Sequence, residues 1–243
     1  MNDHFELPGG NAREGDASDS LLTRESWKVF QIMAEFVEGY ERLSRIRPSV
    51  SVFGSARTPS DHPYYKLAEA IGYELSSAGF SVVTGGGPGL MEAANKGAFR
   101  GKAASIGLNI QLPHEQRVNA WQDVSLLFTH FFARKVMFVK YASAYVILPG
   151  GFGTLDEFSE ILTLVQTGKS RRIPIILVGR AYWDGLLEWF RERLAAEKMI
   201  AADDIGLLSF AEQAAEVVEL IFEHYGERGF GPSPEEREKM LDL

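Results

Sequence analysis

Short apolar runs alternate with amphipathic runs through most of this sequence, and this alternation constrains the fold more than any other feature. The apolar runs, which have the length of buried strands, are Val50–Phe53, Ser81–Thr84, Ala104–Ile110, Ser125–Phe128, Ala144–Leu148 and Pro174–Val178. The amphipathic runs, which have helical spacing, are Tyr64–Ala78, Leu90–Phe99, Phe132–Tyr141, Leu155–Gln166, Trp183–Ala196 and Ala211–Tyr225. This pattern predicts a doubly wound α/β fold, a parallel sheet covered on both faces. Such sheets bind ligands beyond the carboxyl ends of their strands, so a site is expected in the loops that follow the strands.

The sequence predicts one folded domain with an extension at each end. Residues 1–20 are polar and rich in Gly, Asn and Asp, which indicates a disordered N-terminal arm. Residues 21–48 carry apolar side chains at three- and four-residue spacing, which predicts an extra N-terminal helix. Residues 49–225 hold the alternating pattern, and residues 226–243 are expected to form a weakly ordered tail. A chain of 243 residues suits one such domain.

The composition excludes several kinds of site. The net charge of −8 argues against a non-specific grip on a nucleic-acid polymer, although a local cluster of donors can still hold a small anion. The chain has no cysteine, so it has no disulfide, zinc–thiolate site or cysteine nucleophile. The longest apolar stretches are too short to cross a bilayer, and the N-terminus lacks a basic-then-apolar signal pattern. We therefore expect a cytoplasmic protein without membrane contact.

The loop after the first predicted strand consists of small residues followed by a cation. Gly54, Ser55 and Ala56 allow a phosphate or a ribose to approach the backbone, where Arg57 meets its charge. An ordinary turn with an exposed arginine explains the same residues equally well. We expect Gly54 and Ser55 to contact a substrate.

The run TGGGPGLMEAAN, from Thr84 to Asn95, ends a strand in three glycines and enters a helix. Glycines expose N–H groups, and a helix N-terminus favours an anion, so Gly86 and Gly87 are expected to contact a substrate. The run lacks the final glycine of the dinucleotide fingerprint, and no acid lies on the next strand to hold a ribose diol. It is not a P-loop either, because no Gly-Lys-Ser/Thr follows. A nicotinamide enzyme is therefore disfavoured.

A second glycine-rich run, LPGGFGTLDEF, extends from Leu148 to Phe158 and combines glycines with two acids. Thr154 is predicted to be the N-cap of a helix, with Glu157 completing a capping box and both acids in the first turn. A cap alone explains one of the acids, but it does not require three glycines. We therefore expect a ligand to touch the backbone here, through Gly150, Gly151, Gly153 and Thr154.

Two adjacent cations, Arg134 and Lys135, interrupt the aromatic helical run Phe131–Lys140. A core helix with two solvated charges is the plain interpretation. The helix follows a predicted strand, however, so both cations are expected at the ligand side of the sheet. Two cations beside two glycine-rich loops favour a phosphate site.

These motifs together resemble the LOG ("Lonely guy") family, the cytokinin-activating nucleoside 5′-monophosphate phosphoribohydrolases long mislabelled as lysine decarboxylases. The resemblance covers roughly Ser49–Tyr225 and is carried by Gly85–Glu92, Arg134–Lys135 and Pro149–Glu157. It implies a Rossmann-like fold, usually in a dimer with the active site near the subunit interface, and no required metal or organic cofactor. Arg134 and Glu157 match the two catalytic positions. The positions that match substrate contacts are Glu115, Lys135, Phe152, Gly153, Thr154, Leu155, Asp156, Glu157 and Thr163.

The expected function is hydrolysis of AMP or N6-modified AMP to a free base and ribose 5-phosphate by a homodimer or higher homo-oligomer. Two alternatives are a non-catalytic carrier of a nucleotide or of molybdenum cofactor, and a nucleotide-sensing regulator. Asp156 and Glu157 favour hydrolysis, because a passive anion binder gains nothing from carboxylates beside a phosphate. A decarboxylase is disfavoured, because no lysine lies in a recognisable pyridoxal-phosphate site.

Overall fold

The computed structural model describes residues 14–46, 48–113, 118–226 and 229–241, and these contain a parallel sheet of seven strands. The strands are β1 (Ser49–Phe53), β2 (Ser81–Thr84), β3 (Ser105–Ile110), β4 (Val124–Phe128), β5 (Ala142–Ile147), β6 (Ile175–Val178) and β7 (Leu208–Ala211). Their order across the sheet is β4-β3-β2-β1-β5-β6-β7, and all neighbours are parallel. The strand order reverses between β1 and β5, so the carboxyl ends of these strands form the switch point at which such folds bind ligands.

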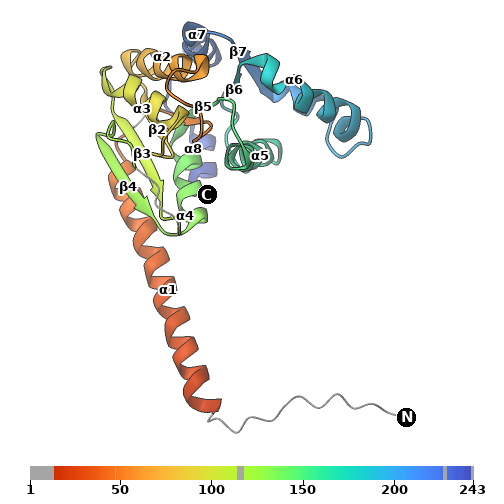
Figure 1. The fold of residues 1–243 in the computed structure, drawn as a ribbon. Coiled ribbons are helices and arrows are strands. Elements are labelled where there is room, and N and C mark those ends of the chain that lie inside the picture. Colours follow the sequence, from red (N-terminus) through yellow and green to blue (C-terminus); the bar gives the residue numbers. More distant parts are fainter. Residues whose placement is uncertain (1–13, 47, 114–117, 227–228, 242–243) are drawn as a thin grey trace.

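Helices cover both faces of the sheet (Figure 1). The helices α2 (Pro63–Ser77), α3 (Leu90–Phe99) and α7 (Ala214–Tyr225) pack over one buried cluster. The opposite face carries α4 (Phe131–Lys140), α5 (Phe152–Gln166), α6 (Arg180–Trp189) and the end of α1 (Glu14–Leu43). The π-helix η1 (Phe190–Ala195), the 3₁₀ helix η2 (Ala202–Leu207) and α8 (Pro234–Leu241) complete the described elements. The prediction of a Rossmann-like, doubly wound α/β fold is confirmed.

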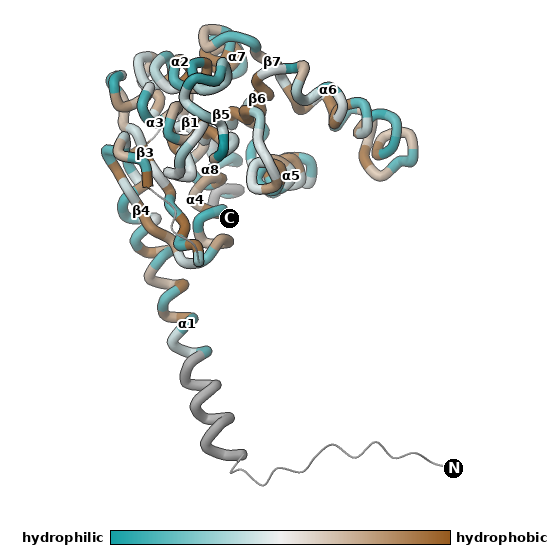
Figure 2. The backbone as a smooth tube through the Cα atoms, in the orientation of Figure 1, coloured by the Kyte–Doolittle hydropathy of each residue, from teal (hydrophilic) through white to brown (hydrophobic). Residues whose placement is uncertain are grey.

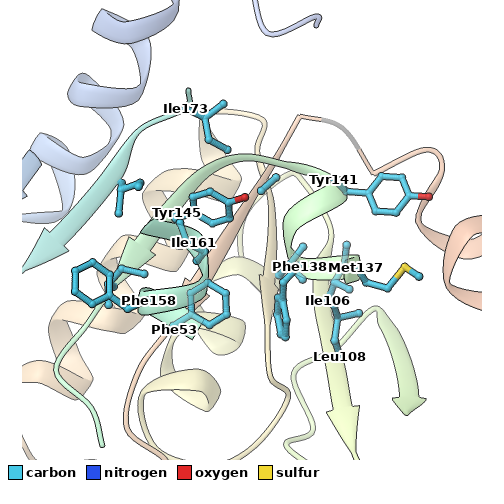
Figure 3. Close-up of a cluster of buried hydrophobic side chains, with 14 of the residues drawn as sticks. Phe53, Ile106, Leu108, Met137, Phe138, Tyr141, Tyr145, Phe158, Ile161 and Ile173 are labelled. Atoms are coloured by element: carbon cyan, nitrogen blue, oxygen red, sulfur yellow. The ribbon is translucent and has the colours of Figure 1, made fainter. Parts of the chain in front are cut away.

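Aromatic packing fixes α4 and α5 against the sheet. Phe53, the last residue of β1, meets Phe138 of α4 with ring centroids 4.9 Å apart. Phe158 of α5 is fully buried in the same cluster, and Figure 3 shows its place near Phe53 and Ile161. Burying a side chain of this size stabilises the fold by roughly 1.5–3 kcal/mol. The helices α4 and α5, which carry the predicted catalytic residues, are therefore packed tightly against the sheet.

The structure corrects the predicted ends of the chain. The N-terminal helix begins at Glu14, so the last residues of the predicted disordered arm are helical; residues 1–13 lie outside the described residues. The predicted weakly ordered tail contains α8, and Phe230 packs its ring against Phe80 at a centroid distance of 4.9 Å. Aromatic contacts with the domain therefore hold a segment whose composition of Gly, Pro and Glu suggested little order.

Strand β7 and the segment before it were not predicted. Its four residues form too short an apolar run to predict a strand, and the sequence pattern predicts Ala211 in the following helix. Pairing with β6 along the edge of the sheet is what makes this segment a strand. The predicted helix Trp183–Ala196 is also corrected, because α6 starts at Arg180 and passes into the π-helix η1 at Phe190.

The helix α1 projects from the domain (Figure 1). Near its end it packs on α4, where a Cβ at Gly39 would lie 2.7 Å from the sulfur of Met137. Farther from the sheet, its apolar side chains are exposed, among them Trp27, Phe30 and Val37. Hydrophobic positions therefore recur along a helix that stands clear of the fold (Figure 2). Among the described residues, no helix combines the length and apolarity needed to cross a membrane.

Candidate functional site

A cleft of about 1010 Å³ opens at the switch point between β1 and β5. One side consists of the loop after β1, residues 54–58, and the other of the loop after β5 with the start of α5, residues 149–155. Arg134, Phe131 and Phe138 enter it from α4, and Glu157 enters from α5. The cleft therefore contains both predicted catalytic residues and most of the predicted substrate-binding backbone.

The loop after β5 presents open backbone to this cleft. The helix α5 begins at Phe152 with Gly151 as its N-cap, and no described side chain caps it. The first three N–H groups of a helix have no partner within it, so those of Phe152, Gly153 and Thr154 are directed outward. A Cβ added at Gly151 or Gly153 would meet no described atom within 4 Å. This loop has both the donors and the room that an anionic ligand needs.

The predicted capping box at Thr154 is wrong. The helix starts three residues earlier than predicted, so Thr154 lies inside its first turn and both Asp156 and Glu157 lie beyond that turn. The hydroxyl of Thr154 instead packs against Gly150, where a Cβ would clash with it. Capping of α5 therefore does not explain why a glutamate occupies position 157.

The other glycine-rich loop, after β2, is closed. Gly85, Gly86 and Gly87 are all buried, and Gly85 lines the cleft while the other two are held by a polar network behind it. The Gln122 side chain donates to the Gly86 carbonyl at 3.0 Å, and the Asn119 side chain donates to the Gly87 carbonyl at 3.1 Å. The structure thus places Gly86 and Gly87, both predicted substrate contacts, outside the cleft lining.

A buried ion pair lines the cleft. Arg134 Nη2 is 3.5 Å from Glu157 Oε1, and the two side chains are 12% and 6% exposed. Burial raises the pKa of Glu157 to about 7, although Arg134 and Lys135 oppose this shift. Burial also lowers the pKa of Arg134, against the opposing effect of Glu157. A carboxylate whose pKa lies near neutrality is suited to exchanging protons during catalysis.

Aromatic rings fix the guanidinium of Arg134. Its centre lies 5.5 Å from the Phe131 ring centroid and 5.4 Å from that of Phe138. Its Nε is buried and has no hydrogen-bond partner among the described residues. A buried donor without a partner costs free energy, which a polar ligand group recovers.

Lys135 joins α4 to α5 instead of lining the cleft. Its Nζ lies 2.9 Å from Asp156 and 3.2 Å from Glu160. Burial by itself lowers the pKa of Lys135, but the contacts with these two carboxylates outweigh it and raise the pKa overall. The predicted substrate contacts Lys135 and Asp156 therefore neutralise each other beside the cleft.

Thr163, a further predicted contact, is not brought to the cleft. Thr163 donates its hydroxyl to the Ser159 carbonyl at 2.8 Å and lines a separate hollow of about 270 Å³ between α5, η1 and η2. Glu115 lies outside the described residues. Gly54, Ser55, Gly150, Phe152 and Leu155, all predicted substrate contacts, line the cleft.

Several residues of the cleft were missed at the level of sequence. Tyr182, from the first turn of α6, donates its hydroxyl to the Gly150 carbonyl at 2.8 Å. His62 precedes α2, where its Nδ1 accepts from the Tyr64 N–H at 3.1 Å. His62 follows β1 and Tyr182 follows β6, so the rule that sites lie beyond carboxyl ends, applied to every strand, would have indicated both.

The lining of the cleft combines polar and apolar groups. Ser55, Arg57 and His62 supply polar side chains, and the open start of α5 supplies backbone N–H groups. Side chains of the apolar kind also line the cleft: Met91, Ile110, Leu112, Phe131 and Phe138. This combination accommodates an anionic group and a flat apolar ring in one molecule. No group of three or more His, Asp or Glu side chains within the described ranges is placed to share a metal ion.

The fold is that of a Rossmann-like α/β protein with a cleft at the switch point of its sheet. A family model described as "Possible lysine decarboxylase" matches residues 91–221, which is more than half of the chain. The chain is 30% identical over 194 residues to the cytokinin riboside 5′-monophosphate phosphoribohydrolase LOG of Oryza sativa subsp. japonica, covering 79% of each protein. It is 28% identical over 169 residues to the phosphoribohydrolase of that name from Mycobacterium marinum, covering 65% of this chain and 90% of the relative.

This chain belongs to the LOG family. Solved structures support the fold. The molybdenum cofactor binding protein of Rippkaea orientalis has a TM-score of 0.51 at 23% identity, over 72% of this chain and 94% of that chain. The Moco carrier protein of Chlamydomonas reinhardtii has a TM-score of 0.50 at 23% identity, over 73% and 98%.

Proposed function

We propose that this protein hydrolyses the N-glycosidic bond of a nucleoside 5′-monophosphate, either AMP or N6-modified AMP, and releases the free base and ribose 5-phosphate. The observation that carries the proposal is the Glu157 carboxylate, buried beside Arg134 in a cleft bordered by the open start of α5. The names of the LOG relatives support a hydrolase of N-glycosyl compounds.

The 5′-phosphate is expected at the start of α5. The outward N–H groups of its first turn and the positive end of the helix dipole favour an anion there. Gly151 and Gly153 leave room for phosphate oxygens to reach these donors. Anchoring a remote phosphate supplies binding energy that positions the reacting carbon.

Glu157 is assigned to the reacting carbon, C1′ of the ribose. As the C1′–N bond breaks, its electron pair leaves with the base and positive charge develops on the sugar, as in other glycoside cleavages. The carboxylate stabilises that charge and takes a proton from the attacking water, whose oxygen then bonds to C1′. Arg134, fixed between aromatic rings, balances negative charge on the phosphate or on the departing base.

The proposed chemistry requires the charged form of Glu157. Because burial raises its pKa to about 7, only part of the population is ionised in neutral solution. Ionising a buried carboxylate costs free energy, and a carrier that only holds an anion has no use for such a group. A hydrolase has a use for it, because the carboxylate stabilises positive charge on the sugar.

The test is a panel of nucleoside 5′-monophosphates, with adenosine as the control without phosphate and chromatography to detect the free base. We expect base release from AMP or its N6-modified forms and almost none from adenosine. Equal turnover of AMP and adenosine would refute the phosphate assignment. Tight binding of nucleotides without base release would identify a carrier instead.

We also propose that the protein works as a homodimer or higher homo-oligomer. Beside the cleft, Phe131, Phe132 and Phe152 are all at least half exposed, and the outer part of α1 adds Phe30 and Val37. Exposed apolar side chains that gather in this way are typical of an interface. Light scattering at micromolar concentration should give at least twice the mass of the 27.0 kDa chain, and a monomer would refute the proposal.

A further inference from the structure

The helix that carries Arg134 has no cap of its own. His130 is the N-cap residue of α4, and its side chain makes no capping bond among the described residues. The first turn contains no acid to complement the helix dipole. Arg134 belongs to this first turn, because its N–H donates to the His130 carbonyl at 3.3 Å. The position of Arg134 therefore depends on how His130 is held.

A carboxylate from α1 holds His130. Glu35 Oε1 accepts from the Thr129 N–H at 2.9 Å, and Oε2 accepts from the His130 N–H at 3.2 Å. His130 Nδ1 also lies 3.1 Å from Glu35 Oε1. The Glu35 side chain is only 13% exposed, so this contact is shielded from water. A carboxylate at a helix start forms charge-assisted hydrogen bonds and interacts favourably with the dipole.

The other end of α4 is also fixed. The hydroxyls of Ser51 and Ser49 donate to the carbonyls of Phe138 and Tyr141, at 2.9 and 2.8 Å. These serines belong to β1, so the sheet holds the C-terminal end of α4. Its N-terminal end is held from α1, the helix that precedes the sheet in sequence.

We infer that Glu35 is a positioning residue for Arg134, and that α1 thereby braces the catalytic helix. The catalytic role of Arg134 in this inference rests on the proposed function. The contact between Glu35 and the start of α4 does not depend on that function. The carboxylate fixes the two peptide groups before α4, His130 then sets the first helical turn, and this turn aims the guanidinium at Glu157. A small displacement of a group that must be aligned with the reacting bond reduces turnover strongly.

The experiment compares three full-length variants with the wild type. Glu35→Gln keeps the side-chain length but removes the charge and one acceptor oxygen. Glu41→Gln makes the same change at an exposed position of the same helix and is the matched control. The double variant Glu35→Gln with His130→Asp supplies α4 with an N-cap from its own sequence.

In Glu35→Gln, hydrogen exchange at residues 129–135 should be about fivefold faster, the effect of losing a helix cap, with the rest of the domain unchanged. Turnover of the nucleotide should fall about tenfold while its KM stays within about threefold. The double variant should recover most of both losses, and Glu41→Gln should match the wild type.

Two results would overturn the inference. One is a Glu35→Gln variant that matches Glu41→Gln in both exchange and turnover. The other is faster exchange throughout the domain without recovery in the double variant, which would make Glu35 a general stabiliser. If the wild type releases no base from any nucleotide, the proposed function fails. Exchange at residues 129–135 then decides whether Glu35 orders the first turn of α4.

Discussion

The two glycine-rich loops of this protein have similar composition and opposite surroundings. In the loop after β2, Gly86 has a positive φ of 70° and is buried, and a Cβ there would clash with the side-chain oxygen of Asn109. In the loop after β5, Gly151 and Gly153 are exposed, and a Cβ at either would meet no described atom within 4 Å. Glycine serves close packing in the first loop and leaves space beside the cleft in the second. The number of glycines does not distinguish these uses.

The helices that follow the two loops differ in the same way. The first N–H of α3 donates to the Ser55 carbonyl at 2.8 Å, and Gly89 lies tightly against the same loop. The start of α5 has no such partner among the described residues. One helix N-terminus is therefore used inside the fold, and the other is available to a ligand.

The largest expected effect is at the open loop. Glu157→Gln should reduce turnover by roughly 10²–10⁴, because it removes the charge that stabilises the transition state. Nucleotide affinity should be retained or improved, since a carboxylate near the phosphate is lost. Base release and nucleotide affinity measured on one preparation test this. Glu160→Gln, one turn further along the helix, is the control and should keep activity within about threefold. Wild-type turnover in Glu157→Gln would remove Glu157 from the mechanism.

The next largest effect is at the closed loop. Gly86→Ala should destabilise the fold by roughly 2–4 kcal/mol, because it combines a strained positive φ with a clash against Asn109. Urea unfolding measures the change. Activity per folded molecule should remain, since Gly86 lies behind the cleft lining. A stable Gly86→Ala variant that no longer binds nucleotide would show that this loop also contacts the ligand.

The pH dependence of stability and of turnover is expected to come from Glu157, in the helix that follows the open loop. The pKa of Glu157, raised by burial from an ordinary 4.5 to about 7, means that the folded state binds this proton more tightly than the unfolded state. The free energy of unfolding should therefore fall between pH 4.5 and 7, by up to about 3 kcal/mol from this group, while turnover rises over the same range. Comparing wild-type and Glu157→Gln unfolding at several pH values isolates this contribution. An identical pH dependence in both would contradict it.

The smallest effect is expected from Gly153→Ala. A methyl group there meets open space, and alanine favours a helix by up to about 1 kcal/mol over glycine, so the melting temperature should be unchanged or higher. The same methyl group crowds the expected phosphate position, so the KM for AMP should rise about tenfold, equivalent to about 1.4 kcal/mol. Steady-state kinetics and thermal unfolding measure both. An unchanged KM would place the phosphate elsewhere.

Much of the fold could be predicted from sequence because local patterns determine it. Strands such as β2 and helices such as α3 were predicted with the observed bounds, since apolar runs and helical periodicity mark buried elements. The edge strand β7 was missed because its identity depends on pairing with β6. Such pairing joins residues far apart in the chain and leaves little mark on a run of four.

The site was predicted less completely, for a related reason. The rule about carboxyl ends located the loops, and Arg134 and Glu157 do meet in the cleft. Whether a loop is open or filled depends on distant side chains: Asn109 and Gln122 close the loop after β2. The start of α5 was misplaced because Thr154 has the chemistry of a cap, while Gly151 occupies that position.

The length of α1 has a consequence for how the molecule moves in solution. A helix of 30 residues rises about 45 Å, so a single chain has the outline of a body with a rod attached. Such a particle meets more friction than a sphere of equal mass and tumbles slowly. If the α1 helices of two chains pack along their apolar faces, the dimer is less elongated than the single chain and its frictional ratio is lower. Sedimentation velocity would then register the pairing of these helices as a change of shape as well as of mass.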